Sequence, residues 1–135
     1  MTDLNKQLLH AARNNDLAKV LELADQGANV AHRGPRGVTA ALIFAGKNNI
    51  EAVMELVHRN PMVLYQQNDC GQTVAIWFAL LNNVDALRQL AEFDSKVLNQ
   101  RTNKNDTIFS LLLNNGNEEA ANELFEVLTG RELVI

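Results

Sequence analysis

The feature that most constrains the fold of this 135-residue chain is a repeat of about 34 residues. Thr39, Thr73 and Thr107 are each 34 positions apart, and a glycine or an asparagine stands two positions before each of them. Pairs of residues that tolerate a left-handed backbone recur with nearly the same spacing, at Asn15-Asp16, Asn48-Asn49, Asn82-Asn83 and Gly116-Asn117. A fixed period of this length is typical of repeat proteins, in which each unit packs only against its neighbours.

Apolar residues follow the same period, in three sets that each fill one position of every unit. These sets are Ala12, Ala45, Ala79 and Leu113; Val20, Val53, Leu87 and Ala121; and Leu23, Leu56, Leu90 and Leu124. We therefore expect one array of four units that spans the chain. Their approximate bounds are residues 4–35, 36–68, 69–102 and 103–130, with a short tail at 131–135.

Each unit is expected to contain a short helix, a turn, a longer helix and a loop. Thr39, Thr73 and Thr107 can cap the first helix through their side-chain oxygens. The asparagine pair closes that helix, and its second member can cap the second helix. The second helix is supported by apolar residues at helical spacing, such as Ile50, Val53, Met54, Leu56 and Val57. The sequence predicts an all-α chain in which stacking of helix pairs buries their apolar sides.

Three segments contain the most specific motifs: Asn68-Asp69-Cys70-Gly71-Gln72-Thr73, Ala11-Ala12-Arg13-Asn14-Asn15-Asp16-Leu17 and Gly27-Ala28-Asn29-Val30. These segments resemble the ankyrin repeat family, whose pattern includes Asp-x-x-Gly-x-Thr-Pro-Leu-His, Ala-Ala-x-x-Gly-His and Gly-Ala-Asp-Val-Asn. The resemblance covers about residues 4–128. It implies an ankyrin-type α-solenoid of about four helix-turn-helix repeats with short loop or hairpin fingers.

The chain departs from the family pattern at the Pro and His that follow the threonine, which are absent from every unit. We therefore expect apolar packing to replace the family's hydrogen-bond ladder of histidines. Tetratricopeptide arrays also have units of 34 residues, with two helices of similar length and a very short connection. The long connection with Pro61 and Gly71, together with a first helix of about two turns, favours the ankyrin arrangement.

The terminal units carry polar residues where the interior units are apolar. Glu118 takes the position that is aliphatic at Leu17, Ile50 and Val84, and Asn5, Lys6 and Gln7 replace apolar residues in the first unit. Polar outer faces are required of terminal repeats, so the array is expected to start and stop with the chain. The apolar tail Leu133-Val134-Ile135 could add a strand to another domain, but we favour its folding back onto the last helix.

The resemblance to ankyrin proteins implies that a partner is held on a concave surface formed by the fingers and the exposed ends of the first helices. The residues predicted to bind protein are Arg33, Arg36, Lys47, Cys70, Trp77, Leu80, Leu81, Arg101 and Lys104. Apolar side chains surrounded by a polar rim are the usual anatomy of a binding hot spot. Here Leu80 and Leu81, with Trp77 nearby, would form the apolar centre within a rim of basic fingertips.

Each of these residues also has a plain structural interpretation. Trp77 and Phe78 are expected to fill the core between helices. A distorted helix end could bury Leu80 or Leu81, and the basic fingertip residues could be ordinary solvated side chains. Cys70 is interpreted as a bystander in a fingertip, because no base is positioned to activate it.

No motif predicts catalysis, a cofactor or a metal site. His10, His32 and His58 fall at unrelated positions of their units and lack ligand spacing. The segment Gly34-Pro35-Arg36-Gly37 lacks the Gly-Lys-Ser/Thr ending of a phosphate loop and is interpreted as a turn. The acidic pair Glu118-Glu119 lies on a predicted helix with no cleft implied. We therefore expect a protein that is not an enzyme.

Charge and hydropathy limit the kinds of partner and the cellular compartment that we expect for this protein. The net charge of −4 argues against nucleic acid. The longest apolar run, 74–81, is far shorter than the roughly 20 residues of a membrane span. The N-terminus lacks a signal pattern and Cys70 is alone, so a cytoplasmic monomer is expected. Frequent asparagine and degenerate repeats resemble ankyrin proteins of intracellular bacteria, some of which are delivered into host cells by a signal-less route.

Three functional hypotheses follow. The first is a non-catalytic module that binds a partner protein through the concave face and fingers. The second is a dedicated inhibitor or chaperone of one enzyme, which makes contact through acidic outer helices that carry Glu51 and Glu55. The third is an enzyme, which would require a metal or cofactor in the purified protein.

Overall fold

A computed structural model of the protein describes residues 3–130, which form eight α-helices, three short 3-10 helices and no strand. The α-helices are α1 (Leu4–Arg13), α2 (Leu17–Asp25), α3 (Ala40–Gly46), α4 (Ile50–Arg59), α5 (Val74–Leu80), α6 (Val84–Phe93), α7 (Ile108–Asn114) and α8 (Glu118–Thr129). The 3-10 helices are η1 (Pro35–Gly37), η2 (Pro61–Leu64) and η3 (Ser95–Asn99). The prediction of an all-α chain is confirmed. The predicted tail with Leu133-Val134-Ile135 lies outside the described residues.

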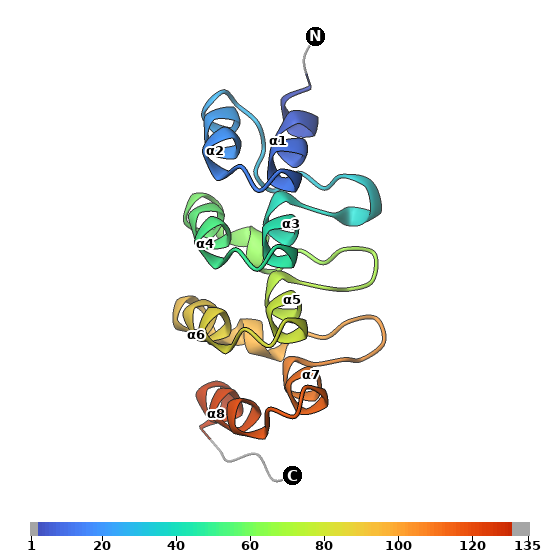
Figure 1. Ribbon diagram of the computed structural model, residues 1–135, viewed down its shortest axis with the longest axis vertical. Helices are drawn as coiled ribbons and strands as arrows, with labels where there is room; N and C mark the ends of the chain where they lie inside the picture. Colours follow the sequence, from blue (N-terminus) through green and yellow to red (C-terminus); the bar gives the residue numbers. More distant parts are fainter. Residues whose placement is uncertain (1–2, 131–135) are drawn as a thin grey trace.

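The helices form antiparallel pairs that follow one another along the long axis of the molecule (Figure 1). The odd-numbered helices form one row, in which α3 packs against both α1 and α5, and α5 packs against α7. The even-numbered helices form a second row on one side of the first. The connections that lead into α3, α5 and α7 project as loops on the opposite side (Figure 1). We call the loops at residues 31–39, 65–73 and 99–107 the first, second and third fingers.

The repeated threonines cap the odd-numbered helices as predicted. The backbone N–H groups of Leu42 and Ile76 donate to Thr39 and Thr73 over 3.2 and 3.3 Å. Both threonine side chains are buried, because the neighbouring units cover them. Thr107 is half-buried and forms a capping box with Ser110, in which each side chain accepts from the other residue's backbone N–H.

The second residue of each polar pair caps the following even-numbered helix. The side-chain oxygens of Asp16, Asn49, Asn83 and Asn117 each accept a backbone N–H over 3.1 Å. The first residue of each pair has a positive φ, between 55° and 75°, at Asn15, Asn48, Asn82 and Gly116. Asparagine and glycine tolerate this conformation, so each pair both closes one helix and opens the next.

The core runs continuously between the two rows of helices. The largest buried side chains include Phe44 and Phe78, which occupy the same position in α3 and α5. Alanines at 41, 45, 75 and 79 are fully buried beside them and let neighbouring helices approach closely. A thin stack of helix pairs is therefore stabilised mainly by aliphatic contacts and two central rings.

The first unit differs from the others in where its first helix begins. Asp3 caps α1 by accepting the backbone N–H of Lys6 over 3.1 Å, so α1 begins about one turn earlier than α3, α5 and α7 relative to the repeat. Lys6 stands at the position that Thr39 and Thr73 occupy in later units. Because Asp3 caps α1 and Lys6 is exposed on the surface of that helix, a lysine is tolerated at the position of a buried capping threonine.

The expectation that apolar packing alone replaces the histidine ladder is wrong, because a ladder of asparagine side chains joins neighbouring units. Asn49 donates through Nδ2 to Asn15 over 2.9 Å, and Asn83 donates to Asn48 over 2.7 Å. Asn117 repeats the bond to Asn82 over 2.9 Å. In each case the amide nitrogen is free to donate because the oxygen of the same side chain caps a helix.

Each terminal unit lacks one of the two groups that form a bond of the asparagine ladder. Asp16 stands at the position of the donors but, as a carboxylate, has no N–H to donate. Gly116 stands at the position of the acceptors and has no side-chain oxygen. Within residues 3–130 the ladder therefore joins the four units through three bonds.

Candidate functional site

The three fingers are joined by hydrogen bonds that repeat from one to the next. Arg33 donates through Nη2 to the carbonyl of Gln67 over 2.9 Å. Gln67, at the equivalent position of the second finger, donates through Nε2 to the carbonyl of Arg101 over 2.9 Å. A side chain of each of the first two fingers thus holds the backbone of the next finger in register.

Backbone contacts join the fingertips as well. The N–H of Asp69 donates to the carbonyl of Arg36 over 2.9 Å, and the N–H of Asn103 donates to the carbonyl of Cys70 over 3.0 Å. Gly71, with φ of 79°, lies so close to Asn103 that an added Cβ would stand 2.6 Å from its backbone nitrogen. Only glycine satisfies both this conformation and this approach.

The charge of the fingers is mixed, which corrects the prediction of a basic rim. Arg36, Arg101 and Lys104 are exposed as expected. However, Asp69 and Asp106 belong to the same loops, and Asp69 lies 3.9 Å from the guanidinium of Arg33. The rim therefore presents both signs of charge rather than a positive field.

The ends of the odd-numbered helices are exposed at every position where the repeat predicts it. These positions are Arg13, Asn14, Gly46, Lys47, Leu80, Leu81, Asn114 and Asn115. Leu80 is 40% exposed and Leu81 42%. Since α5 ends without distortion and Leu81 caps it in a helical conformation, neither leucine is drawn into the core. An apolar pair therefore stands at the surface in the third unit.

The prediction that Trp77 and Phe78 both fill the core holds only for Phe78. Phe78 is fully buried, whereas Trp77 is half-buried and packs against the edge of the core. Trp77 precedes Leu80 by one helical turn, so its ring lies over the same side of α5. The three residues therefore combine one partly covered ring with two exposed aliphatic side chains.

Cys70 is exposed in the second finger, as predicted, and borders a hollow of about 300 Å³ between the second and third fingers. The polar lining includes Asp69, Lys104 and Asp106. The backbone of Cys70 is held by the side chain of Asn68, which accepts its N–H over 3.0 Å. This geometry fixes the position of the thiol at the fingertip but places no histidine in the lining of the hollow.

The three histidines lie apart from one another. His10 is on α1, His32 is in the first finger and His58 is near the end of α4. His58 lies 6.3 Å from the ring of Phe93, centroid to centroid. Within residues 3–130, no three side chains of His, Cys, Asp or Glu are grouped so that they could hold a metal ion. The segment at Gly34–Gly37 is a 3-10 turn, in agreement with its interpretation from the sequence.

The even-numbered helices form the second candidate surface. Glu51 and Glu55 of α4 are exposed. Some acidic residues of this row are paired instead: Arg59 lies 2.8 Å from Asp25 of the preceding unit. The acidic face is therefore interrupted by ion pairs that cross from one unit to the next.

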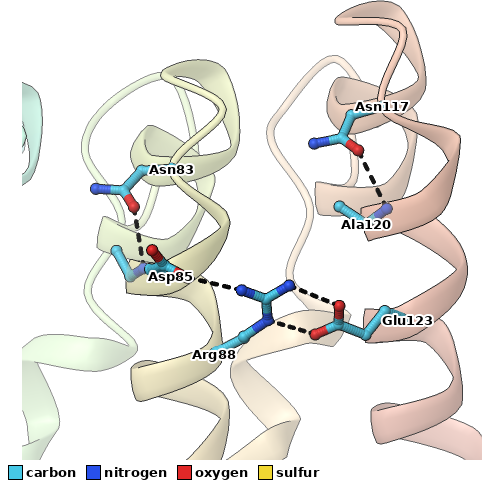
Figure 2. A network of polar contacts seen from close by, with 7 residues as sticks. Asn83, Asp85, Arg88, Asn117, Ala120 and Glu123 are labelled. Carbon is cyan, nitrogen blue, oxygen red and sulfur yellow. Dashed lines mark hydrogen bonds and ion pairs between the residues drawn. The ribbon is translucent and has the colours of Figure 1, made fainter.

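An ion pair with two hydrogen bonds between its partners joins α6 to α8. Arg88 donates through Nε and Nη2 to the two carboxylate oxygens of Glu123 over 2.5 and 2.7 Å, and through Nη1 to Asp85 over 2.7 Å (Figure 2). These hydrogen bonds hold the pKa of Glu123 below its ordinary value and raise the pKa of Arg88. Asn83 and Asn117 cap the two helices beside this contact (Figure 2).

Comparison with known proteins adds no assignment, since no family model and no curated protein matches this chain. Among the helices of residues 3–130, none combines the length and the hydropathy needed to cross a membrane.

Proposed function

We propose that this protein is a non-catalytic binding module of the ankyrin repeat family, which holds a partner protein between its fingers and the ends of its odd-numbered helices. The observation that carries the proposal is the exposed pair of Leu80 and Leu81 at the end of α5. Burying exposed aliphatic side chains and a neighbouring aromatic ring against a partner lowers the free energy of the complex. Trp77 supplies that ring.

The joined fingers support a binding role. Ordering a loop during association costs conformational entropy, which lowers affinity. Here Arg33 and Gln67 hold the backbones of the next fingers, and backbone bonds join the fingertips. A partner would therefore meet a surface that is already organised.

The mixed charge of the rim defines the partner further. Arg36, Arg101 and Lys104 are exposed cations, and Asp69 and Asp106 stand among them. The partner we propose presents an apolar segment to Leu80 and Leu81, with acidic groups placed to meet the cations. Such contacts at an exposed rim are screened by salt, so association should slow as ionic strength rises.

Membership of the ankyrin family is supported by the positions of the caps and turns. Gly37, Gly71 and Asn105 have a positive φ two positions before the repeated threonines. Long connections precede short first helices, as in ankyrin repeats and unlike tetratricopeptide repeats. We further propose that the protein acts in a reducing cytosol, with delivery into a host cell as one route to it.

The test is affinity capture from native cytosol and, separately, from a host lysate, with quantitative mass spectrometry. The variants are Leu81→Asp at the end of α5 and, as a matched control, Glu51→Lys with Glu55→Lys on α4. We expect one protein to be enriched by the wild type, lost with Leu81→Asp and retained with the α4 variant. Equal enrichment of every captured protein by the wild type and Leu81→Asp contradicts this binding surface.

A second proposal is that the protein inhibits or chaperones one enzyme through its even-numbered helices. It is supported by Glu51 and Glu55, which are exposed and take part in none of the ion pairs of residues 3–130. In the same experiment this proposal predicts the opposite pattern, in which the α4 variant loses the partner and Leu81→Asp retains it.

A further inference from the structure

A hollow of about 520 Å³ opens between α1 and α2 at the N-terminal end of the stack. Its floor includes Ala11 and Leu23, which are both buried. Its rim is polar and includes Asp3, Lys6, Gln7, His10, Arg13, Asn14, Asp16 and Lys19. An apolar floor, a few polar groups around it and a volume of roughly 300–1,000 Å³ are the usual properties of small-molecule sites.

The hollow exists because the first unit lacks a ring that the interior units have. Ala11 occupies the position that Phe44 and Phe78 fill in α3 and α5, where both rings are fully buried. In the first unit a methyl group stands in place of the ring, and no helix pair of residues 3–130 covers it. The space that a phenyl group occupies elsewhere is therefore open to solvent.

The rim offers two cations without a carboxylate partner. Asp3 and Asp16 each accept a backbone N–H over 3.1 Å as helix caps, and Lys19 lies 3.4 Å from Glu22. Lys6 and Arg13 take part in none of the ion pairs found in residues 3–130. An anionic group at the rim can therefore pair with either cation at little cost in broken contacts.

A second copy of the chain does not fit this end. Lys19 stands at the position of Ala52, Ala86 and Ala120, which are buried against the preceding unit. Stacking another helix pair here would bury the charged end of Lys19, which is costly without a partner. The asparagine ladder also ends at Asp16, so a further unit would gain no bond from it.

We propose that this hollow binds a small amphipathic anion. An aromatic or branched apolar group lies over Ala11 and Leu23, in the space that a phenyl ring fills in the interior units. A carboxylate, phosphate or sulfonate of the same molecule pairs with Lys6 and Arg13. This site lies outside the fingers and shares only Arg13 and Asn14 with the exposed helix ends, and it does not depend on the function proposed for them.

The experiment uses anilinonaphthalene sulfonate as the probe, titrated into isotope-labelled protein. We expect saturable binding at one site, seen as chemical-shift changes confined to α1 and α2 and as a rise in fluorescence. The neutral relative phenylnaphthylamine should bind about tenfold more weakly, because it lacks the anionic group. Equal affinity for the two probes contradicts the role of Lys6 and Arg13.

The decisive variant is Ala11→Phe, which fills the hollow as Phe44 and Phe78 fill the equivalent space. It should keep the helical content and thermal stability of the wild type and weaken probe binding by at least about tenfold. Lys6→Gln combined with Arg13→Gln should weaken the anionic probe alone. Lys96→Gln removes an exposed cation of η3, outside the hollow, and serves as the matched control with unchanged binding.

Three results would overturn the proposal. The first is a folded Ala11→Phe variant that binds the probe as tightly as the wild type does. The second is a probe that shifts no resonance of α1 or α2. The third is concentration-dependent association of the wild type that Ala11→Phe abolishes, since a second copy would then occupy the hollow.

Discussion

The two interior helix pairs, α3–α4 and α5–α6, differ from the terminal pairs in how completely the same positions are covered. Phe44 and Phe78 are fully buried in the interior, whereas the equivalent position in α1 is Ala11 on the floor of an open hollow. At the other end, Phe109 and Phe125 stand at the positions of the buried Ala75 and Ala91, and these two rings are only partly buried and meet edge to face at 5.4 Å. Units with the same pattern of caps and apolar residues are therefore stabilised to different extents, depending on how far neighbouring units cover them.

The polar contacts show the same difference. The α3–α4 pair donates one asparagine bond to the first unit through Asn49 and accepts another from Asn83 through Asn48. Each terminal unit takes part in only one bond of this ladder, since Asp16 cannot donate and Gly116 cannot accept. In a stack where each unit contacts only its neighbours, an interior position is supported from two sides and a terminal one from one side.

The largest expected effect comes from removing an interior ring. Phe78→Ala leaves a cavity between covered helices and should lower the free energy of unfolding by about 3–5 kcal/mol. Phe125→Ala in α8 removes a ring that is partly exposed and should cost less than about half as much. Urea unfolding followed by circular dichroism measures both. Equal losses would mean that the terminal and interior units are covered alike.

A smaller effect is expected from the caps. Thr73→Ala removes a buried cap and the hydrogen bond from Thr73 to Gln100, which spans 2.6 Å, and should cost about 1–2 kcal/mol. Thr107→Ala removes a cap that is half-buried, where water can replace the lost oxygen, and should cost about 1 kcal/mol or less. The comparison is made on the same unfolding curves, and a larger loss at Thr107 would reverse the proposed order.

The asparagine ladder can be tested with a pair of conservative variants. Asn83→Asp keeps the capping oxygen but removes the N–H that bonds to Asn48, and should cost about 0.5–1 kcal/mol. Asp16→Asn makes the reverse change at the end of the ladder, where no acceptor lies beyond it, and should change stability by less than about 0.5 kcal/mol. Equal effects of the two variants would show that the ladder bonds contribute nothing to stability.

The smallest effect concerns the ion pair between α6 and α8. Hydrogen bonds from Arg88 depress the pKa of Glu123 below about 4.5, so their contribution is complete above that pH. The contribution is lost as the pH falls through the depressed pKa, because the carboxylate becomes protonated in the folded protein. Arg88→Gln should therefore be less stable than the wild type at about pH 7, and this deficit should be smaller at about pH 3.

Thermal melts at the two pH values measure this difference. The control is Lys19→Gln, whose partner Glu22 lies 3.4 Å away on the same helix of the first unit. It should show a smaller pH-dependent difference, since a single exposed contact within one helix contributes little. A deficit of Arg88→Gln that stays constant between the two pH values would contradict the role of the ion pair.

Much of the backbone could be predicted from the sequence because its determinants are local. Thr73 identifies a helix start because a hydroxyl caps the N–H three residues later. Asn82-Asn83 identifies a helix end and the next start because asparagine tolerates a positive φ and also caps. The exposure of Leu80 and Leu81 followed from the same helical register. These features need no knowledge of what lies in the neighbouring unit.

The contacts between units could not be predicted in the same way. The amide nitrogen of Asn83 and the oxygen of Asn48 are 35 residues apart, and their meeting depends on the rotation between successive units. The sequence did contain a signal for these bonds between units. Asparagine recurs at both positions of the pair, although a single asparagine is enough to cap a helix. The half-buried state of Trp77 likewise depends on the tilt of α5 against its neighbours. The finger carboxylates Asp69 and Asp106 are visible in the sequence, so the mixed charge of the rim could have been predicted from it.

The most direct test of the central claim, that neighbours on both sides stabilise the interior units, is native-state hydrogen exchange resolved by residue. The account predicts that amides of α3 and α5 exchange most slowly, through global unfolding, and that amides of α1, α2 and α8 exchange faster, through local opening of the ends. Protection that is uniform from α1 to α8, or greatest in the terminal helices, would contradict it.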